Sequence, residues 1–588
     1  MQNFTSYFSE KILIKLLAGY RAKHAHRRHK LHMMRDISLH PSTKKFINKQ
    51  PNTEFEVLQN IFPTRRNWVR LNEKERKKCD NSVKQVTERL YKSYICYKYK
   101  RIPLNECEEW YQNLIKLVNK IKETIANLDD YDMDSPKIFG ILKKIKKKET
   151  EYRPIAIYSL EDRLISSLTS RYLTDSFDHY FHDCSFAFRS SKREERFTHH
   201  KSIEKIIEYR KSKEEIWVSE CDIQKFFDTV NHKHIYKVFL DHIKEIRLSH
   251  NITIDERAII IFNKFLNSFA FNKDVYPKND QKEFWIDNKM RENGYFKWIE
   301  ETLINEYGKD YLKSRIGVPQ GNAISCFISN LLLHSVDSKV KSVCNEIFYV
   351  RFCDDMILMH ENKAKCEEGL EIYKTELKKN YLSFHEPSIC ENYTTKENWK
   401  RFWRDSKSKL PYIWANPKII ENAFPWLSFV GYQIKYDQEV RLRRDAIRKE
   451  KRKQVAQVEN ILKAIAIKEG NLNDTSRKSS RQLIFSLQTR FSSMSVGRIK
   501  LRTYKFDKQG LCWTNGFEII KGKRNKSISK QLKQLDSFRE KQVWRFKSEL
   551  KSLNKKSENP DLIDDDMFFG SPYSYHNYLN DYENDSSL

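Results

Sequence analysis

The sequence predicts a mixed fold of helices and strands in its central part, with helical segments before and after it. Between about residues 138 and 440, short apolar runs typical of strands alternate with helical patterns, as in an α/β or α+β domain. The strand-like runs are Arg153–Tyr158, Ile216–Asp222, Ile347–Arg351 and Met356–His360. With 588 residues, the chain is long enough for about three to five domains.

The chain carries a large positive charge. Its 109 Lys and Arg residues exceed its 79 Asp and Glu residues, which gives a formal net charge of +30. This surplus favours a polyanionic partner, with nucleic acid as the first candidate and an anionic membrane surface as the second; a generally Lys-rich proteome is the remaining explanation. Hydrophobic residues make up 39% of the sequence, so a buried core is expected and wholesale disorder is excluded.

Neither a membrane span nor a disulfide framework is indicated. No apolar run approaches the ~18 residues that a bilayer-spanning helix needs. The short run Ile12–Leu17 is interrupted by Lys15 and lacks a signal-peptide cleavage site. The 11 cysteines are odd in number, scattered and without a CxxC pair, which argues against disulfides and a zinc site. We therefore expect a cytoplasmic protein with no membrane partner.

Residues 1–137 are predicted to form a basic, helical N-terminal extension. Residues 23–30 are rich in His, Arg and Lys, a composition that suits a solvated or phosphate-contacting helix better than a metal site. Residues 51–130 show the three- and four-residue spacing of helices at Val83, Val86, Leu90, Trp110, Leu114, Leu117 and Ile121. Farther along, the polar, aromatic-containing stretch 240–315 is interpreted as helices and an insertion.

Residues 441–556 are predicted to form a second basic, helical region. Cations are concentrated in its first turns, at Arg441, Arg443, Arg444, Arg448, Lys449, Lys451, Arg452 and Lys453. Residues 557–588 contain no Lys or Arg, but they hold three consecutive acids and the tyrosines Tyr573, Tyr575, Tyr578 and Tyr582. This composition predicts an acidic, flexible tail.

Three carboxylates stand where strands are predicted to end. Asp222 follows a buried strand, at the lip of a sheet, although an Asp there also fits an ordinary helix N-cap. Asp354 and Asp355 lie between two apolar runs, as at a hairpin tip, where burial requires cations to neutralise them; an exposed turn is the alternative. Taken together, the three acids predict a metal site.

The metal that these acids predict is Mg²⁺, as two ions, with Mn²⁺ as an alternative. Mg²⁺ takes oxygen ligands and keeps waters or substrate phosphates, so few protein carboxylates are needed. In such sites the ions lie about 3.5–4 Å apart, and one activates an attacking hydroxyl while the other stabilises the leaving oxygen. The predicted chemistry is in-line phosphoryl transfer.

Two further segments support this chemistry. Lys146–Lys148 precede Arg153, and cations on a hairpin grip a triphosphate; a solvated basic turn would explain the lysines but not Arg153. Gly317–Asn322, which includes Gln320, is a turn that allows a substrate to approach the backbone closely, or a plain loop before the buried-helix pattern that follows.

Six blocks of the sequence, in this order, resemble those of the reverse transcriptases, and in particular the prokaryotic non-retroviral branch. One such block is weakly specific, whereas six in order are very specific. The resemblance covers about residues 138–440. The blocks are Arg153–Arg163, Ser185–Arg189 (similar to SFGFR, with Ala187 for Gly), Asp222–His232, Gly317–Asn330, Phe352–Asp355 (similar to YADD) and Trp426–Tyr432.

The resemblance implies an α+β right-hand polymerase of fingers, palm and thumb, with a helical N-terminal extension and a helical C-terminal region. Residues 138–440 would form the fingers and palm, and residues 441–556 the thumb and C-terminal region. The implied activity is that of an RNA-directed DNA polymerase, a nucleotidyltransferase that copies an RNA template with dNTPs into a DNA product.

The resemblance also implies roles for single residues. Asp222, Asp354 and Asp355 would be the catalytic metal ligands. The nucleotide would be held by Lys146 and Arg153 at its triphosphate, by Phe227 as the steric gate against a ribose 2′-hydroxyl, and by Gln320 along the pocket. The nucleic-acid backbone would be gripped by the basic helix of the thumb, at Arg441, Arg443, Arg444, Arg448, Lys449 and Arg452.

The sequence departs from the family pattern in three places. Phe352 replaces the usual Tyr and Cys353 the common Ala, so contacts to the primer terminus are expected to differ. The block at 383–388 lacks the Lys that is regarded as a general acid for pyrophosphate, and His385 is its candidate substitute. The gap between Asp228 and Gly317 is longer than usual, which again suggests an insertion in the palm.

The extension, the insertion and the helical C-terminal region look most like the unknown-group and abortive-infection enzymes. These resemble antiviral defence proteins that often work with a structured non-coding RNA, so phage defence with such a template is expected. Many intron proteins carry a C-terminal Cys cluster, but none follows Cys512 here. The Val-Thr-Gly motif of retron enzymes is not found either. The alternatives are an intron maturase-like RNA-binding splicing factor and a template-independent or protein-primed polymerase.

Protein priming would use a hydroxyl of the acidic tail. Some members of this group start DNA synthesis on a protein side chain. The candidates here are Tyr573, Tyr575, Tyr578 and Tyr582, against the simpler interpretation of a solubilising tail.

Overall fold

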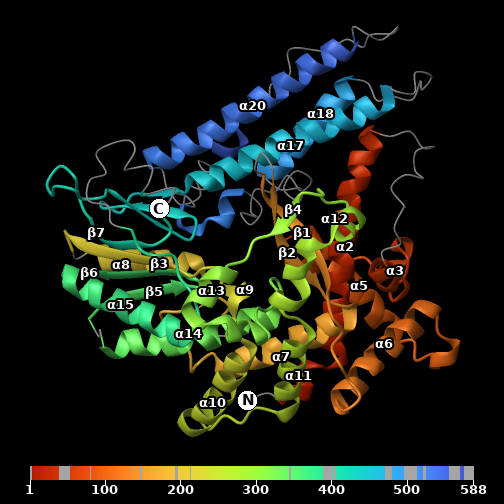
Figure 1. The fold of residues 1–588 in the computed structure, drawn as a ribbon. Helices are drawn as coiled ribbons and strands as arrows, with labels where there is room; N and C mark the ends of the chain where they lie inside the picture. Colours follow the sequence, from red (N-terminus) through yellow and green to blue (C-terminus); the bar gives the residue numbers. More distant parts are fainter. Residues whose placement is uncertain are drawn as a thin grey trace. The chain divides into compact units, whose positions relative to one another are not determined.

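The computed structural model contains two compact units (Figure 1). The first unit comprises residues 1–12, 118–430 and 435–438, and the second comprises residues 13–117, 431–434 and 439–588. The structure describes residues 3–38, 53–79, 81–145, 149–192, 196–211, 213–343, 346–388, 402, 406–469, 480–495, 513–520, 525–554 and 570–574. No helix within these residues combines the length and the apolar character that crossing a bilayer requires.

A four-stranded antiparallel sheet forms the middle of the first unit. Its order is β5-β6-β3-β7, with β3 at Ile216–Asp222, β5 at Phe348–Phe352, β6 at Asp355–His360 and β7 at Lys409–Trp414. Three of these strands confirm the predicted apolar runs to within one residue at each end. Met356 to Met359 are all buried, which explains why β6 reads as a continuous apolar run rather than as an alternating one.

Helices of the first unit bury this sheet and one another. α15 (Lys363–Lys379) packs against β3, β6 and β7, and α14 (Ala323–Val343) packs against α15, α7 (Leu160–Phe177) and α10 (His232–His250). Phe177, Phe239, Phe262 and Phe327 form an aromatic core between α7, α10, α11 (Glu256–Ser268) and α14. Because α14 is buried on nearly every side, its sequence is apolar without a polar stripe.

A smaller sheet carries the predicted basic hairpin. Antiparallel β1 (Lys137–Ile145) and β2 (Thr150–Ile157) are joined by β4 (Gly294–Phe296), which runs parallel to β2. The stretch 240–315, interpreted from the sequence as helices and an insertion, therefore also supplies a strand to this sheet. Buried Trp285 and Phe296 from that stretch pack under Tyr152 of the hairpin.

The remaining elements of the first unit are short or flank these layers. Phe4 in α1 packs edge-to-face on Tyr172 of α7. The bounds are α1 (Phe4–Tyr7), α8 (His199–Lys211), α9 (Phe226–Thr229), the π-helical turn η4 (Phe271–Val275), the 3-10 turns η5 (Tyr276–Asp280) and η6 (Lys309–Lys313), α12 (Lys282–Asp287), α13 (Glu300–Tyr307) and β8 (Trp426–Phe429).

The N-terminal part of the second unit is helical, as predicted. Tyr94, Tyr97 and Tyr111 pack together where α5 meets α6. The elements are α2 (Glu10–Ser38, whose first turn belongs to the first unit), α3 (Thr53–Asn60), the 3-10 turns η2 (Arg65–Asn67) and η3 (Leu104–Glu106), α4 (Glu73–Lys77), α5 (Ser82–Lys98) and α6 (Glu109–Ala126, whose last turns belong to the first unit).

Long helices form the C-terminal part of the second unit. α17 (Arg444–Glu469), α18 (Ser480–Ser495) and α20 (Lys526–Asn554) share a core that includes Ile461, Leu487 and Phe546. Before them, β9 (Tyr432–Lys435) pairs with β10 (Val440–Leu442), and the 3-10 turns η9 (Trp513–Gly516) and η10 (Glu518–Ile520) precede α20.

The structure corrects two expectations in this part of the chain. Arg441 lies in β10 rather than in the basic helix, which begins at Arg444. Tyr573, expected in a flexible tail, is 1% exposed: its hydroxyl donates to Glu450 and its backbone N–H to Asp536. This burial argues against Tyr573 as a priming residue. Tyr575, Tyr578 and Tyr582 lie outside the described residues, and their priming role stays a prediction.

Buried histidines cluster between α10 and α14. The rings of His182 and His242 lie 4.9 and 5.3 Å from that of His334, and the Tyr180 hydroxyl lies 2.7 Å from Nδ1 of His242. Burial lowers the pKa of His334 to about 2, and it lowers the pKa values of His242 and His182 as well. These imidazoles are therefore neutral in the folded chain.

This cluster predicts a loss of stability in mild acid. Below pH 6.5 the unfolded chain binds protons at these histidines and the folded chain does not, so stability is complete above pH 6.5 and falls as the pH decreases. The loss is about 2 kcal/mol for His334 by pH 5. Urea unfolding at pH 7.5, 6 and 5 measures it. His334→Asn should flatten the dependence, and the exposed His250→Asn should leave it unchanged; equal slopes in both variants would contradict the prediction.

Candidate active site

Asp222, Asp354 and Asp355 lie at neighbouring ends of the central sheet. The antiparallel register of β3 and β6 places Asp222, the last residue of β3, opposite Asp355, the first residue of β6. Cys353 and Asp354 form the two-residue turn between β5 and β6. Cys353 takes φ 60°, a left-handed conformation that suits the twist of such hairpins. The structure thus brings together the three predicted carboxylates.

The surroundings of Asp222 and Asp354 are unequal. Burial raises the pKa of Asp354, and the charge of Asp222 raises it further. Asp222 has two basic neighbours: Nζ of Lys407 lies 2.9 Å from Oδ2, and Nε2 of His385 lies 3.4 Å from the same atom. Sequence reasoning named His385 but missed Lys407, which is 185 positions away along the chain.

The donor chemistry of this site fits a hard divalent cation. Asp222 and Asp354 offer oxygen only, and the raised pKa of Asp354 reflects a partly buried pair of like charges that a cation would relieve. Within the described ranges, no group of three His, Cys, Asp or Glu side chains gathers closely enough to hold a metal ion. Asp222 and Asp354 are half-buried, and Asp355 is exposed beside them.

A buried ion pair supports the turn that carries Asp354. Arg351 on β5 donates from Nε and Nη2 to the two carboxylate oxygens of Asp337 on α14, at 2.9 and 2.7 Å. Its Nη1 donates to the carbonyl of Cys353 at 3.1 Å. Burial alone would lower the pKa of Arg351, but Asp337 reverses this and raises it. The pair was missed in the sequence, where an Arg inside an apolar strand was its signal.

The segment Ser185–Arg189 completes this support rather than touching the carboxylates. Phe186 N–H donates to the carbonyl of Arg351 at 2.9 Å, which ties the segment to β5. The guanidinium of Arg189 is buried and donates to the Asp178 carboxylate at 2.9 Å and to the Ser185 carbonyl at 2.9 Å. This block of the family pattern is therefore structural here.

Phe227 and Gln320 are brought together through Asp228. Gln320 Nε2 donates to Asp228 Oδ1 at 2.8 Å, and Val318 N–H donates to the Phe227 carbonyl at 2.7 Å. Asp228 is buried, and burial raises its pKa even though Lys225 lies 3.6 Å away. The two predicted pocket residues thus lie on adjoining segments, and the Asp228 link was missed in the sequence.

Glycine is required where these two segments meet. Gly317 takes φ 91°, in the left-handed region, and a Cβ placed on it would lie 2.4 Å from Cβ of Phe271. Its N–H donates to the Val230 carbonyl at 2.8 Å. A larger residue would therefore push the turn away from the segment that carries Phe227.

The predicted triphosphate ligands are only partly covered by the structure. Arg153 lies on β2 opposite Ile141 of β1 and is exposed. Lys146 belongs to the tip between these strands and lies outside the described residues. Lys143, on β1, is engaged by Glu151 at 2.8 Å, whereas Lys144 on β1 is exposed like Arg153.

Residues 145–388 match the family model described as reverse transcriptase (RNA-dependent DNA polymerase). The chain carries a reverse transcriptase domain. The matched range contains the three predicted catalytic carboxylates, Phe227 and Gln320. The predicted fold class, an α+β right-hand polymerase, is confirmed, and the protein is a nucleotidyltransferase of the RNA-directed DNA polymerase type.

Several solved structures are similar to the chain, and no curated protein matches it. Apo telomerase from Candida tropicalis is 11% identical, with a TM-score of 0.35, over 87% of this chain and 82% of that one. Telomerase from Candida albicans in complex with a TWJ fragment of telomeric RNA is 11% identical, with a TM-score of 0.29, over 87% and 77%. The corresponding Candida tropicalis complex is 12% identical, with a TM-score of 0.33, over 82% and 66%.

Most of the predicted nucleic-acid contacts of the polymerase are exposed on the second unit. Arg443, Arg444, Arg448, Lys449 and Arg452 are exposed on or just before α17. Arg441 differs: it is half-buried, its Nε donates to Gln433 Oε1 at 2.9 Å, and burial lowers its pKa. Arg441 therefore braces β10 against β9 instead of facing a ligand.

A lysine-lined groove lies beside this basic helix and was not predicted. It has a volume of about 550 Å³ and is formed mainly by one face of α20, with Lys451 from α17. Nζ of Lys451 lies 5.2 Å from the ring centre of Phe538 in the groove. No ion pair within the described residues engages its lysines, which are Lys451, Lys526, Lys530, Lys533 and Lys541.

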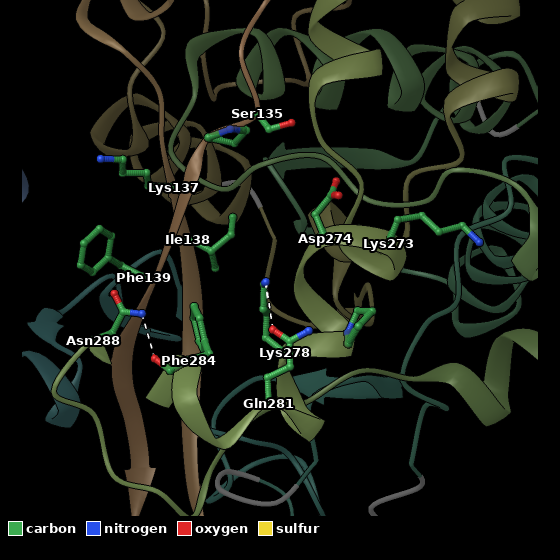
Figure 2. Close-up of a pocket in the computed structure, with 12 residues that line it drawn as sticks. Ser135, Lys137, Ile138, Phe139, Lys273, Asp274, Lys278, Gln281, Phe284 and Asn288 are labelled. Carbon is green, nitrogen blue, oxygen red and sulfur yellow. Dashed lines mark hydrogen bonds between the residues drawn. The ribbon is translucent and has the colours of Figure 1, made fainter. Parts of the chain in front are cut away.

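A second cavity, of about 460 Å³, lies between the start of β1 and the stretch 273–288 (Figure 2). Ile138 points into it from β1, and Lys278 donates to Gln281 Oε1 at 3.0 Å on the opposite wall. None of the predicted catalytic or nucleotide-binding residues lines it, so it is separate from the polymerase site.

The Arg351–Asp337 pair predicts an asymmetric response to substitution. Arg351→Leu leaves a buried, uncompensated carboxylate and should lower the free energy of unfolding by about 3–5 kcal/mol, whereas Arg351→Leu with Asp337→Leu should recover part of this loss. Lys213→Leu, which breaks a more exposed pair with Glu361, is the control and should cost less than about 1 kcal/mol. Urea unfolding measures all three. An Arg351→Leu protein as stable as the wild type would contradict the support role.

Proposed function

We propose that this reverse transcriptase copies a structured non-coding RNA into DNA and serves antiviral defence against phage. The observation that carries the polymerase part is the pairing of Asp222 with Asp355 at neighbouring strand ends, with Asp354 in the adjoining turn, inside the matched domain. The defence role and the nature of the template are supported by the N-terminal extension, the additional elements at 240–315 and the helical C-terminal region, which resemble those of the defence-associated enzymes.

Asp222 and Asp354 would hold the divalent ions, with Asp355 beside them. Bound Mg²⁺ or Mn²⁺ supplies charge neutralisation at the attacking and leaving oxygens of phosphoryl transfer. Lys407 and His385 both approach Oδ2 of Asp222, and Lys407 supplies the positive charge that offsets this carboxylate from one side. We assign to His385 the task of donating a proton to the pyrophosphate, because its Nε2 lies beside the site, 3.4 Å from Oδ2 of Asp222.

The nucleotide would be selected by the segments that Asp228 joins. Phe227 is half-buried and would present part of its ring to the sugar, and Gln320 is held in place by its hydrogen bond to Asp228. Arg153 would pair with the triphosphate, and Lys146 would add a second cation from the hairpin tip. This arrangement favours dNTPs over NTPs because the ring occupies the space of a 2′-hydroxyl.

The nucleic acid would be gripped through its backbone. The exposed cations of α17 are joined by the lysine groove of α20, and together they present charges without sequence-reading geometry. Such contacts suit a template–product duplex whose sequence changes at every step of synthesis.

Loss of one catalytic carboxylate should abolish synthesis without unfolding the chain. Asp354→Asn removes a charge from the metal site, which should slow DNA synthesis by about a thousandfold, or about 4 kcal/mol. Primer extension with Mg²⁺ and dNTPs measures the rate. Asp310→Asn, which changes an exposed acid on η6, is the control. Wild-type synthesis by Asp354→Asn would contradict the assignment.

Two further experiments, with Asp354→Asn as the inactive control, test the nature of the template and the defence role. Protein purified with its bound RNA is supplied with Mg²⁺ and dNTPs, and the DNA is sequenced. A product complementary to one co-purified RNA supports a non-coding template, and a product without a template supports the template-independent alternative. In cells, the wild type should reduce phage plaques and Asp354→Asn should not; equal plaque counts would overturn the defence role.

Phe227 should set the preference for deoxynucleotides. Phe227→Val opens the space for a 2′-hydroxyl, so the ratio of kcat/KM for CTP to that for dCTP should rise about 10- to 200-fold, the usual range for a small change of pocket volume. The exposed Phe485→Val on α18 is the control and should keep the wild-type ratio. An unchanged ratio in Phe227→Val would remove Phe227 from the nucleotide pocket.

A further inference from the structure

Trp68, in the second unit, is clamped by two arginines from neighbouring helices. Its side chain is 6% exposed, and its indole N–H donates to the Pro63 carbonyl at 2.8 Å. Arg89 on α5 donates to the carbonyls of Trp68 and Val69 at 3.2 and 3.3 Å, and its guanidinium lies 5.6 Å from the indole ring centre. The guanidinium of Arg21 on α2 lies 5.8 Å from the same ring. The turn around Trp68 is therefore rigidly held.

This rigid turn presents further arginines to solvent. Arg65, Arg66 and Arg70 are all exposed. Arg65 and Arg70 lie near enough to Arg89 to help lower its pKa, with burial as the larger cause. We refer to Arg65, Arg66, Arg70 and Arg89 as the arginine cluster. Arg65 and Arg70 thus lie near Arg89, which contacts the buried tryptophan, and Arg66 is exposed next to Arg65 in the chain.

The cluster is not neutralised within the part of the chain that the structure describes. No ion pair there engages any of its four members. The two acids of α4, which follow in sequence, have partners elsewhere: Glu73 pairs with Lys77 at 3.2 Å and Glu75 with Lys92 at 2.7 Å. Like charges held together without a counter-charge repel one another, so an anionic ligand would stabilise this arrangement.

We propose that the arginine cluster binds the phosphodiester backbone of an RNA, at a site separate from the polymerase site. Guanidinium groups match phosphate oxygens with paired hydrogen bonds, which makes arginine well suited to hold nucleic acid in place. The choice of RNA over DNA rests on the proposed function, in which the enzyme keeps a structured RNA as its template. Backbone contacts of this kind read shape and charge rather than sequence.

The salt dependence of RNA binding tests the proposal. The variant Arg65→Gln/Arg66→Gln/Arg70→Gln removes three exposed charges and leaves Arg89 on Trp68. The probe is a fluorescently labelled RNA hairpin, titrated at several salt concentrations. Each lost phosphate contact lowers the slope of log K against log salt by about 0.7–0.9, so the slope should fall by about two to three.

A charge-matched control separates specific contacts from overall charge. Lys116→Gln/Lys122→Gln/Lys237→Gln removes three exposed lysines of α6 and α10 and should keep the wild-type slope. Both variants should keep the wild-type melting temperature, since the side chains are exposed. The proposal is overturned if both triple variants bind the hairpin alike, or if the wild type binds a DNA hairpin as tightly as the RNA.

Primer extension on a short, pre-annealed RNA–DNA substrate distinguishes this proposal from the proposed function. The arginine variant should extend it at the wild-type rate, because the cluster lies outside the matched domain. A different outcome is that the wild type makes no DNA while the arginine variant still shows a smaller slope of log K against log salt than the wild type. In that case the proposed function fails and the RNA site stands.

Discussion

The catalytic geometry depends on one buried ion pair, between Arg351 and Asp337. The backbone of Arg351 pairs with Cys184 and Phe186 on one side and with β6 on the other, while its side chain reaches α14 and the Cys353 carbonyl. A buried charge is costly unless its hydrogen-bonding groups are satisfied, and Arg351 meets this condition with several acceptors. The position of the Asp354 turn relative to Asp222 therefore follows from contacts made below the hairpin rather than at its tip.

The candidate active site is acidic, whereas the chain as a whole is strongly basic. In a protein of net charge +30, acids are gathered at the end of β3 and the start of β6, where burial and mutual repulsion raise the pKa of Asp354. The basic side chains of Lys407 and His385 approach this acidic group only on the side of Asp222. The remaining side favours cations and their phosphate ligands, so the site attracts the reacting groups while the basic surfaces attract the polymer.

The local parts of this site could be predicted from sequence, and the long-range parts could not. β5 and β6 are buried over most of their length, so their apolar runs are nearly continuous and end where the acids stand, whereas β3 mixes buried and half-buried residues before Asp222. Lys407, Asp337 and the Gln320–Asp228 link come from distant segments, and no spacing along the chain marks them. Arg441 was misplaced because charge density does not distinguish a strand from a helix. Tyr573 was misplaced because composition predicted solvent exposure where Glu450 and Asp536 supply buried acceptors.

The two unpredicted basic surfaces differ in a way that matches the demands of template copying. A polymerase must let the duplex advance by one nucleotide in each cycle, and the lysines of the α20 groove, as flexible point charges, bind a backbone without fixing its register. The arginine cluster is held rigidly on Trp68, and its forked donors suit phosphates that stay in place. An enzyme that retains its own RNA needs both kinds of contact, because one that only slides loses the RNA and one that only holds cannot copy it.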